Sequence, residues 1–305
     1  MRTVEAGRRI DLKNILFATD FSSCSNAALP YALSIARRFG ATLHAAYVKP
    51  TDAEVFFASP ESWPTVAEAD EKRVQARIEQ MEKQLHDLPH DVLTPRGKVA
   101  EAVASIIEEW SIDLLVLGTH GRSGLGKLLM GSVAEEIFRR AACPVLSVGP
   151  NLRTKPDDEI HLQRILFATD FSEDALAALA HAISLAEEDE AQLTLLHVVE
   201  QPAAGIADAE EVNASLMFRL RQLVPAEADP WCHAECQVAF GRQFAPAAES
   251  ILEVAKDRKV DLMVLGARPL HGKFGQVMTH LASTTAQILT QATCPVLTVR
   301  GVSTK

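Results

Sequence analysis

The chain has 305 residues, about twice the usual length of a single domain, so two domains are expected. Asp and Glu number 40 against 30 Lys and Arg, and the net charge of −10 argues against a nucleic-acid binder, which needs a clustered basic surface. Hydrophobic residues make up 48% of the chain, enough to build packed cores, and this excludes a disordered protein.

The chain carries no signal for export or for a membrane. No stretch approaches the roughly 18 apolar residues of a membrane span. Residues 1–13 are rich in charge and lack the apolar segment of a signal peptide. Five cysteines are too few for a disulfide scaffold and fit a reducing compartment. We therefore expect a cytoplasmic protein without membrane or nucleic-acid partners.

An internal repeat organises the chain. The octapeptide ILFATDFS occurs at residues 15–22 and again 150 positions later. Two further pairs follow in the same order: DLLVLG (113–118) with DLMVLG (261–266), and CPVLSV (143–148) with CPVLTV (294–299). A repeat of this length is domain-sized and too long for a solenoid unit.

The repeat predicts a tandem duplication. We place one domain at 1–149, a second at 161–305, and a linker at 150–160, where prolines and mixed charges gather. Elements of the first copy follow from short apolar runs that alternate with amphipathic stretches. We predict strands near 14–19, 42–48, 91–95, 114–118 and 145–148, and helices near 25–39, 67–85, 99–110 and 133–141.

This alternation predicts the fold class. The strands are continuous apolar runs, which is typical of parallel strands buried on both faces. We expect an α/β protein with two doubly wound parallel five-stranded sheets flanked by helices, a Rossmann-like arrangement. Ligands of such sheets bind beyond the carboxyl ends of the strands.

A glycine-rich loop follows the fourth strand. Its spacing is Gly118-x₂-Gly121-x₉-Gly131-Ser132, and a helical run begins at Val133. Glycine lets a backbone approach a ligand closely, and the N–H groups at a helix start favour phosphate. The alternative is a turn followed by a serine N-cap. His120 lies inside the loop, where a phosphate contact and a solvent-facing turn are equally open.

Two better-known phosphate motifs fit less well. Residues 121–128 almost spell a P-loop, but Leu128 replaces the hydroxyl residue that would hold Mg²⁺. A dinucleotide fingerprint requires glycines directly after the first strand, and Asp20-Phe21-Ser22 stands there instead.

The glycine motif, the Asp that closes the first strand and the CPVLxV terminal strand together resemble the universal stress protein family, whose fold is adenine nucleotide alpha hydrolase-like. The likeness covers nearly the whole chain as two consecutive domains. It implies ATP as ligand, a stress-response role and at most weak ATPase activity. It also implies contacts, taken over by position: Ala18, Thr19, Asp20, Val48, Gly118, His120, Gly121, Gly131, Ser132 and Val133.

Two of these positions carry more detail. The resemblance implies that Asp20 lies near the ribose or a phosphate-bound Mg²⁺, although an N-cap role for Asp20 fits equally well. It implies that the backbone of Val48 meets the adenine. The terminal strands at 145–148 and 296–299 resemble the family's dimer edges, so they can pair within the chain as an intrachain pseudo-dimer, and such chains can form a homodimer.

The second copy departs from the motif. Pro269 stands where the second glycine belongs, and Ala282 replaces the glycine before Ser283. We expect this domain to be structural or regulatory, or to hold a different ligand. Two alternatives to a regulatory ATP-binding protein stay open: a slow ATP-hydrolysing enzyme, and a nucleotide-free dimerisation scaffold.

Overall fold

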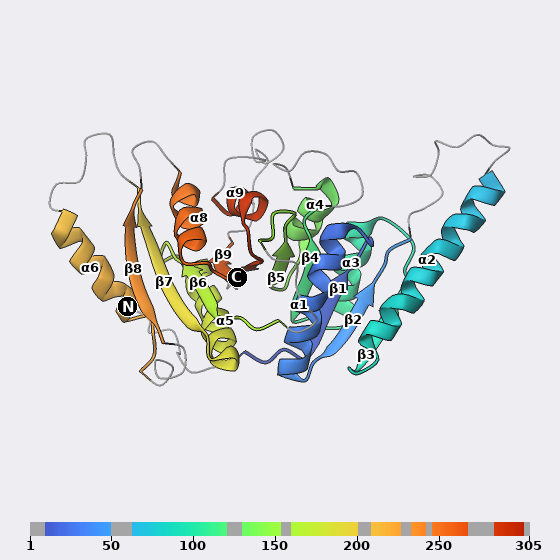
Figure 1. Cartoon of the computed structure of the whole chain (residues 1–305), viewed down its shortest axis with the longest axis horizontal. Helices are drawn as coiled ribbons and strands as arrows, with labels where there is room; N and C mark the ends of the chain where they lie inside the picture. The colour runs from blue at the N-terminus through green and yellow to red at the C-terminus, as the bar shows by residue number, and fades with distance from the viewer. Residues whose placement is uncertain are drawn as a thin grey trace.

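Both halves of the chain fold into alternating strands and helices (Figure 1). The computed structural model describes residues 10–49, 63–120, 130–153, 160–200, 209–226, 233–241, 246–267 and 284–301, with the side chains of the long second helix described from residue 71. The first half consists of β1 (Asn14–Ala18), α1 (Ser23–Phe39), β2 (Thr42–Ala46), α2 (Trp63–Leu85), β3 (His90–Leu93), α3 (Val99–Glu109), β4 (Leu114–Gly118), α4 (Ser132–Arg140) and β5 (Val145–Val148).

The second half repeats this order. Its elements are β6 (Arg164–Ala168), α5 (Glu173–Asp189), β7 (Gln192–Val199), α6 (Ala209–Arg221), β8 (Glu235–Phe240), α8 (Ala247–Asp257), β9 (Leu262–Gly266), α9 (Thr284–Gln291) and β10 (Val296–Val299). Every strand and helix predicted for the first half is present. The predicted strand at 42–48 ends earlier, at Ala46, although Tyr47 N still donates to Leu93 O over 3.0 Å.

The strands form one ten-stranded sheet in the order β3-β2-β1-β4-β5-β10-β9-β6-β7-β8. Within each half all pairings are parallel, and the strand order reverses direction between β1 and β4, and between β6 and β9. This confirms the doubly wound α/β prediction. It also sets two switch points, at which ligands of such sheets bind.

The two halves join through the antiparallel pair β5–β10. Leu297 lies opposite Leu146, and Thr298 Oγ1 donates to Val145 O over 3.1 Å. This confirms the pairing of terminal strands predicted for an intrachain pseudo-dimer. Since these edges are used inside the chain, a homodimer of chains needs another surface, and it stays a prediction.

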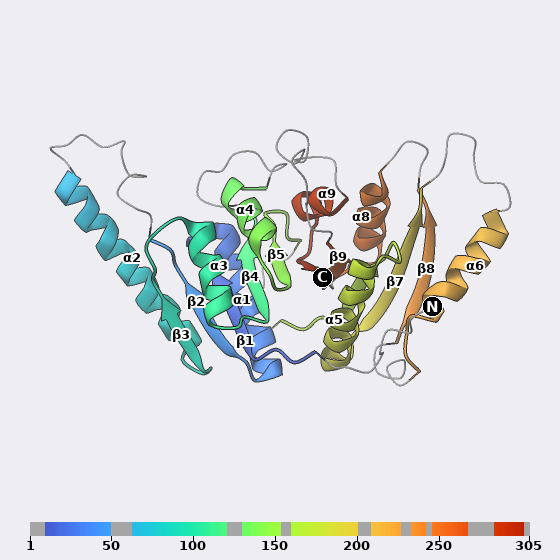
Figure 2. The same cartoon turned by 180° about the vertical axis from the view of Figure 1, so that it is seen from behind.

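Helices cover both faces of the sheet. On one face α1, α2, α5 and α6 share a single hydrophobic core that includes the buried Phe17 and Phe167. On the other face α3 and α4 cover the first half, and α8 and α9 cover the second. Met130 and Phe138 pack against both of these smaller cores. Figures 1 and 2 show α2 and α6 at opposite ends of the molecule.

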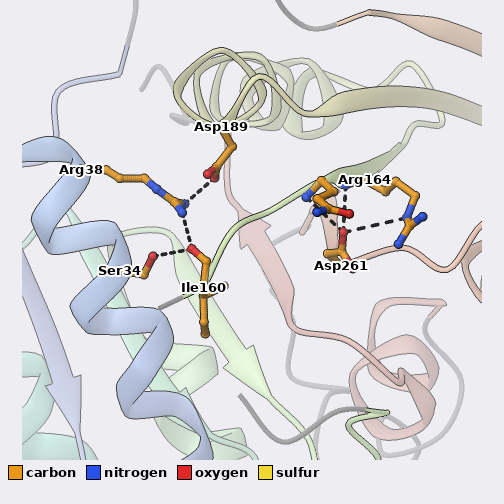
Figure 3. A network of polar contacts seen from close by, with 7 residues as sticks. Ser34, Arg38, Ile160, Arg164, Asp189 and Asp261 are labelled. Atoms are coloured by element: carbon orange, nitrogen blue, oxygen red, sulfur yellow. Dashed lines mark hydrogen bonds and ion pairs between the residues drawn. The ribbon is translucent and has the colours of Figure 1, made fainter. Parts of the chain in front are cut away.

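Segments that precede β1 and β6 cross to the helix of the other half. Ile10 N donates to Ser184 Oγ over 3.0 Å, and the equivalent Ser34 Oγ donates to Ile160 O over 2.8 Å. Arg38 extends the second contact, because its guanidinium bonds both Ile160 O and the Asp189 carboxylate (Figure 3). The side chains of this ion pair are 15% and 2% exposed, so it is a buried link between the halves.

An aspartate that occurs in both repeats, Asp113 and Asp261, accepts hydrogen bonds from the residues at the start of the first strand of its half. Asp113 Oδ2 accepts from the backbone N–H groups of Lys13 and Asn14, and Asp261 Oδ2 does the same for Gln163 and Arg164 (Figure 3). The aspartate that opens the DLLVLG and DLMVLG repeats therefore has a structural role in each half.

We predict that Arg38→Met lowers the free energy of unfolding by about 3–5 kcal/mol, because it leaves the Asp189 carboxylate buried without its cation. The matched control is Arg37→Met. Arg37 pairs with Asp87 at the surface, where both side chains are about two-fifths exposed, so this change should cost about 1 kcal/mol or less. Urea unfolding followed by circular dichroism measures both, and equal losses would contradict the assignment.

We also predict a pH signature of Asp189. Burial raises the pKa of its carboxyl to about 6, although Arg38 acts in the opposite direction. Between about pH 4 and pH 6 the folded protein then keeps a proton that the unfolded chain has released, so the free energy of unfolding falls as pH rises. Relative to Asp189→Asn, the wild type should lose on the order of 2 kcal/mol across this window and nothing further above about pH 7. A gain over the same window would show that Arg38 dominates.

Candidate functional site

The first-half switch point gathers most of the predicted site residues. Ala18 ends β1, Gly118 ends β4, and Ala18 lies beside Leu117 in the sheet register. His120 follows β4, and its carbonyl oxygen accepts from Ser22 Oγ over 3.1 Å. Residues almost 100 positions apart therefore meet at one edge of the sheet.

The TDFS segment after β1 forms a tight turn. Thr19 Oγ1 accepts from Phe21 N over 2.9 Å. Asp20 Oδ1 accepts from Ser22 N over 2.9 Å and from Ser25 Oγ over 3.0 Å. The N-cap of α1 is Ser22, so the alternative that made Asp20 the N-cap is wrong. Asp20 instead holds the turn that precedes the cap.

The turn is repeated in the second half. Phe21 and Phe171 both adopt left-handed backbone, with φ of 59° and 60°, which is strained for residues other than glycine. Each ring packs against a ring of the next strand region, Tyr47 at 5.1 Å and His197 at 4.7 Å. Asp170 Oδ1 likewise accepts from a backbone N–H two residues on. The ILFATDFS repeat therefore encodes a turn common to both halves.

Gly118, the first glycine of the loop motif, has a packing role. A Cβ at this position would lie 2.6 Å from Ser25 N and 2.7 Å from the carbonyl carbon of Cys24. At the equivalent Gly266, a Cβ would lie 2.4 Å from Ala175 N. Glycine is needed in both halves because the first turn of a helix lies directly against the end of the strand.

We predict that Gly118→Ala lowers the free energy of unfolding by about 2–3 kcal/mol, since backbone atoms of α1 must move to admit the methyl group. The matched control is Gly149→Ala, where the nearest atom to an added Cβ is Leu289 O at 3.6 Å, an ordinary contact. Thermal unfolding of both variants checks this. A Gly118→Ala chain as stable as the control would show that the packing relaxes without cost.

The start of α4 has the character of an anion site. Gly131 is the N-cap, with φ of −61° and ψ of 140°, and within the described part of the chain no side-chain cap bonds the helix start. Ser132 is the first helical residue, so the alternative that made it an N-cap is wrong. The N–H groups of a helix's first turn lack acceptors within the helix. Val133, in this turn, is 47% exposed. Gly121 lies outside the described residues.

Two further predicted contacts flank this edge. His120 Nδ1 lies 2.9 Å from Thr119 Oγ1, while its Nε2 is buried without a hydrogen-bond partner in the described part of the chain. Val48 is buried beyond the end of β2. Tyr47 N and Lys49 N both donate toward β3, to Leu93 O and Pro95 O, so the alternation of a strand turns the backbone groups of Val48 toward β1.

Cys143 and Cys294 occupy equivalent positions just before the last strand of each half. Burial raises the pKa values of the Cys143 and Cys294 thiols to about 12, which disfavours the reactive thiolate. Among the residues that the structure describes, no group of three or more His, Cys, Asp or Glu side chains is placed to hold a metal ion. Within the same residues, no helix is both long and apolar enough to cross a membrane.

Comparisons with known proteins identify the family. The model of the universal stress protein family matches residues 11–149 and 161–300. The chain belongs to the universal stress protein family. A universal stress protein of Mycolicibacterium smegmatis is 27% identical over 301 residues, 94% of this chain and 96% of the relative. One from Methanocaldococcus jannaschii is 33% identical over 138 residues, 45% of this chain and 81% of the relative.

A solved structure agrees on the fold. The crystal structure of a universal stress protein from Archaeoglobus fulgidus has a TM-score of 0.66 to this chain, with 20% identity, and the match covers 94% of this chain and 98% of that one. The architecture of two universal stress protein repeats therefore extends over nearly the whole chain.

Sequence reasoning missed one feature, a large cavity in the second half. It has a volume of about 980 Å³ and lies at the switch point between β6 and β9. Ser132, predicted as a nucleotide contact of the first half, is among the residues that line it. The loss of the motif glycines in this half was the available signal, but it does not indicate a cavity.

Proposed function

We propose that the first half of this universal stress protein binds ATP and that the bound state is read by partner proteins. The observation that carries the proposal is the α4 N-terminus, which has glycine at its N-cap and is tied to the end of β4 because Gly131 N donates to Thr119 O over 2.9 Å. The positive end of a helix with unsatisfied N–H groups favours phosphate.

The surrounding residues fit a nucleotide. Gly131 allows phosphate oxygens to reach the N–H groups of Ser132 and Val133 without a Cβ in the way. The backbone N–H and C=O groups of Val48 point to the side of β2 on which β1 lies, but β1 ends at Ala18, before it reaches Val48. These two groups would therefore offer a donor and an acceptor to the adenine edge. Ala18 and Thr19 form the floor between these two ends of the ligand.

Asp20 and His120 complete the proposed site. The turn fixes Asp20 through two hydrogen bonds to Oδ1, beside the first turn of α1. A Mg²⁺ ion carried by the phosphates would supply positive charge there, and Asp20 is the residue placed to meet it directly or through water. His120 Nε2 is a buried polar atom that a phosphate oxygen would satisfy.

The role that fits this site is regulation by population shift. ATP would stabilise one arrangement of α4 and the loop before it, and a partner that prefers this arrangement would bind more tightly. Because α4 also contacts the second half through Phe138, the nucleotide state would be transmitted to the joint between the halves.

We predict one ATP-binding site per chain by calorimetry with ATP and Mg²⁺, and at least about tenfold weaker binding in Gly131→Val. The backbone angles of Gly131 suit valine, so the variant should fold and the loss reports on the phosphate approach. The matched control is Ala282→Val, the same substitution at the equivalent position of the second motif, which should leave ATP binding unchanged. Unaltered binding in Gly131→Val, or no binding in the wild type, would contradict the proposal.

A further inference from the structure

Arg77 of α2 contacts the turn that follows β1. Its Nη1 donates to the carbonyl oxygen of Phe21 over 2.8 Å, although the two residues are 56 positions apart. Its guanidinium lies 5.7 Å from the centre of the Phe21 ring, within the range of a favourable cation–π contact. The same ring stacks on Tyr47 at 5.1 Å. A distant helix therefore holds both the backbone and the side chain of Phe21.

The backbone of Phe21 needs this support. Its φ of 59° lies in the left-handed region, which a residue other than glycine keeps only where the surrounding structure holds it. On the inner side of the turn, Phe21 N donates to Thr19 Oγ1 over 2.9 Å. On the outer side, Arg77 bonds the carbonyl oxygen. Both polar groups of the strained residue are thus fixed.

A single peptide group links Arg77 to Asp20. The carbonyl oxygen of Phe21 and the N–H of Ser22 belong to the same planar unit and point in opposite directions. Arg77 bonds the oxygen, and Asp20 Oδ1 accepts from the N–H over 2.9 Å. Hydrogen bonds in such a chain strengthen one another. The arginine therefore fixes the group to which the Asp20 carboxylate is bonded.

The helix that carries Arg77 is itself fixed. Ile78, the next residue, is buried, and so are Met81 and Leu85 further along α2. These three side chains belong to the same hydrophobic core as Phe21. Packing therefore sets the position of Arg77 relative to the turn.

The second half contains an equivalent contact. The guanidinium of Arg219 on α6 lies 4.0 Å from the centre of the ring of Phe171, the other left-handed phenylalanine. Leu220 follows Arg219 and is buried, just as Ile78 follows Arg77. The two helices differ in length, with 23 and 13 residues, yet both place an arginine on the turn.

We infer that Arg77 is a positioning residue of the nucleotide site, which sets the orientation of Asp20 toward Mg²⁺ through the peptide group between residues 21 and 22. The inference rests on the proposed function. The other proposed contacts are held separately, because hydrogen bonds to β3 flank Val48 and Thr119 O accepts from Gly131 N at the start of α4. Loss of Arg77 should therefore weaken the metal contact and spare the contacts to adenine and phosphate.

Calorimetry with ATP, once with Mg²⁺ and once with EDTA, tests the inference on the full chain. We expect Arg77→Met to weaken binding of ATP with Mg²⁺ about tenfold and to change binding of Mg²⁺-free ATP by less than about twofold. A general structural loss would weaken both equally. If only the charge of Arg77 mattered, Mg²⁺-free ATP would be weakened more, because it carries more negative charge.

Two further variants locate the effect. Arg77 is exposed, so its replacement should leave the chain folded. Arg219→Met makes the same change at the equivalent place in the second half and should bind ATP like the wild type. Asp20→Asn keeps an oxygen acceptor for the turn and removes the charge. In that background Arg77→Met should cause no further loss, since the two residues act as one unit.

Hydrogen exchange measured by mass spectrometry follows the turns without any ligand. Because a lost hydrogen bond lets a turn open more often, the amides of residues 19–25 should exchange faster in Arg77→Met than in the wild type. They should exchange at the wild-type rate in Arg219→Met. The amides of residues 169–175 should show the reverse pattern.

Three results would overturn the inference while the wild type still binds ATP. These are equal losses with and without Mg²⁺, unchanged exchange of residues 19–25 in Arg77→Met, and equal losses of ATP affinity in Arg77→Met and Arg219→Met. No ATP binding by the wild type would contradict the proposed function and with it the role of Arg77 in that site. The exchange pattern would then still decide whether Arg77 holds the turn.

Discussion

The antiparallel pairing of β5 with β10 is the contact on which the rest of the structure depends. It converts two open sheet edges into the interior of one ten-stranded sheet. It also sets the helices of one half against the chain of the other. Three further contacts between the halves follow from this joint. They are the crossing segments at Ile10 and Ile160, the Arg38–Asp189 ion pair, and the hydrogen bond from Arg300 to Ala141 O at the end of α4.

The duplication acts as an internal control that separates structural from ligand-specific residues. The TDFS turn, the glycine after the fourth strand and the aspartate before it make the same contacts in both halves. These features are required by the fold in both halves, so they do not by themselves distinguish one half from the other. The halves differ at Gly121 and Gly131, replaced by Pro269 and Ala282. The sequence difference between the halves that bears on our proposal therefore lies between the fourth strand and the helix that follows it.

Much of this organisation could be predicted from the sequence. The repeat and the apolar patterns predict the period, the element order and the parallel topology, because those patterns are visible along the sequence. The resemblance to the family predicts the pairing of the terminal strands. The capping details could not be predicted: the N-caps are Ser22 and Gly131, two positions and one position away from the expected Asp20 and Ser132, and only backbone geometry decides between such close neighbours. The cavity was out of reach for a different reason. Its lining combines segments separated by more than 100 residues, including α4 from the other half, and no local pattern records that meeting.

The two halves also show how a shared scaffold accommodates different chemistry. In the first half the start of α4, with glycine at its N-cap, lies next to the end of β4, and in the second half mostly apolar side chains line the switch point. Helix α4 contacts both sites: Gly131 N, at its start, donates to Thr119 O beyond the end of β4, while Ser132, Glu135 and Phe138 line the cavity of the second half. Any change in the position of α4 would be felt at both, which gives a tandem chain a means of coupling that a single domain lacks.

The central claim is that only one half of the chain is built for a nucleotide. The most direct measurement is to denature freshly purified protein, chromatograph the released small molecules and quantify adenine nucleotide per chain. The account predicts no more than about one nucleotide per chain, reached when ATP and Mg²⁺ are supplied before the protein is separated from free ligand. Two nucleotides per chain would contradict it, because the second half would then bind phosphate despite Pro269 and Ala282.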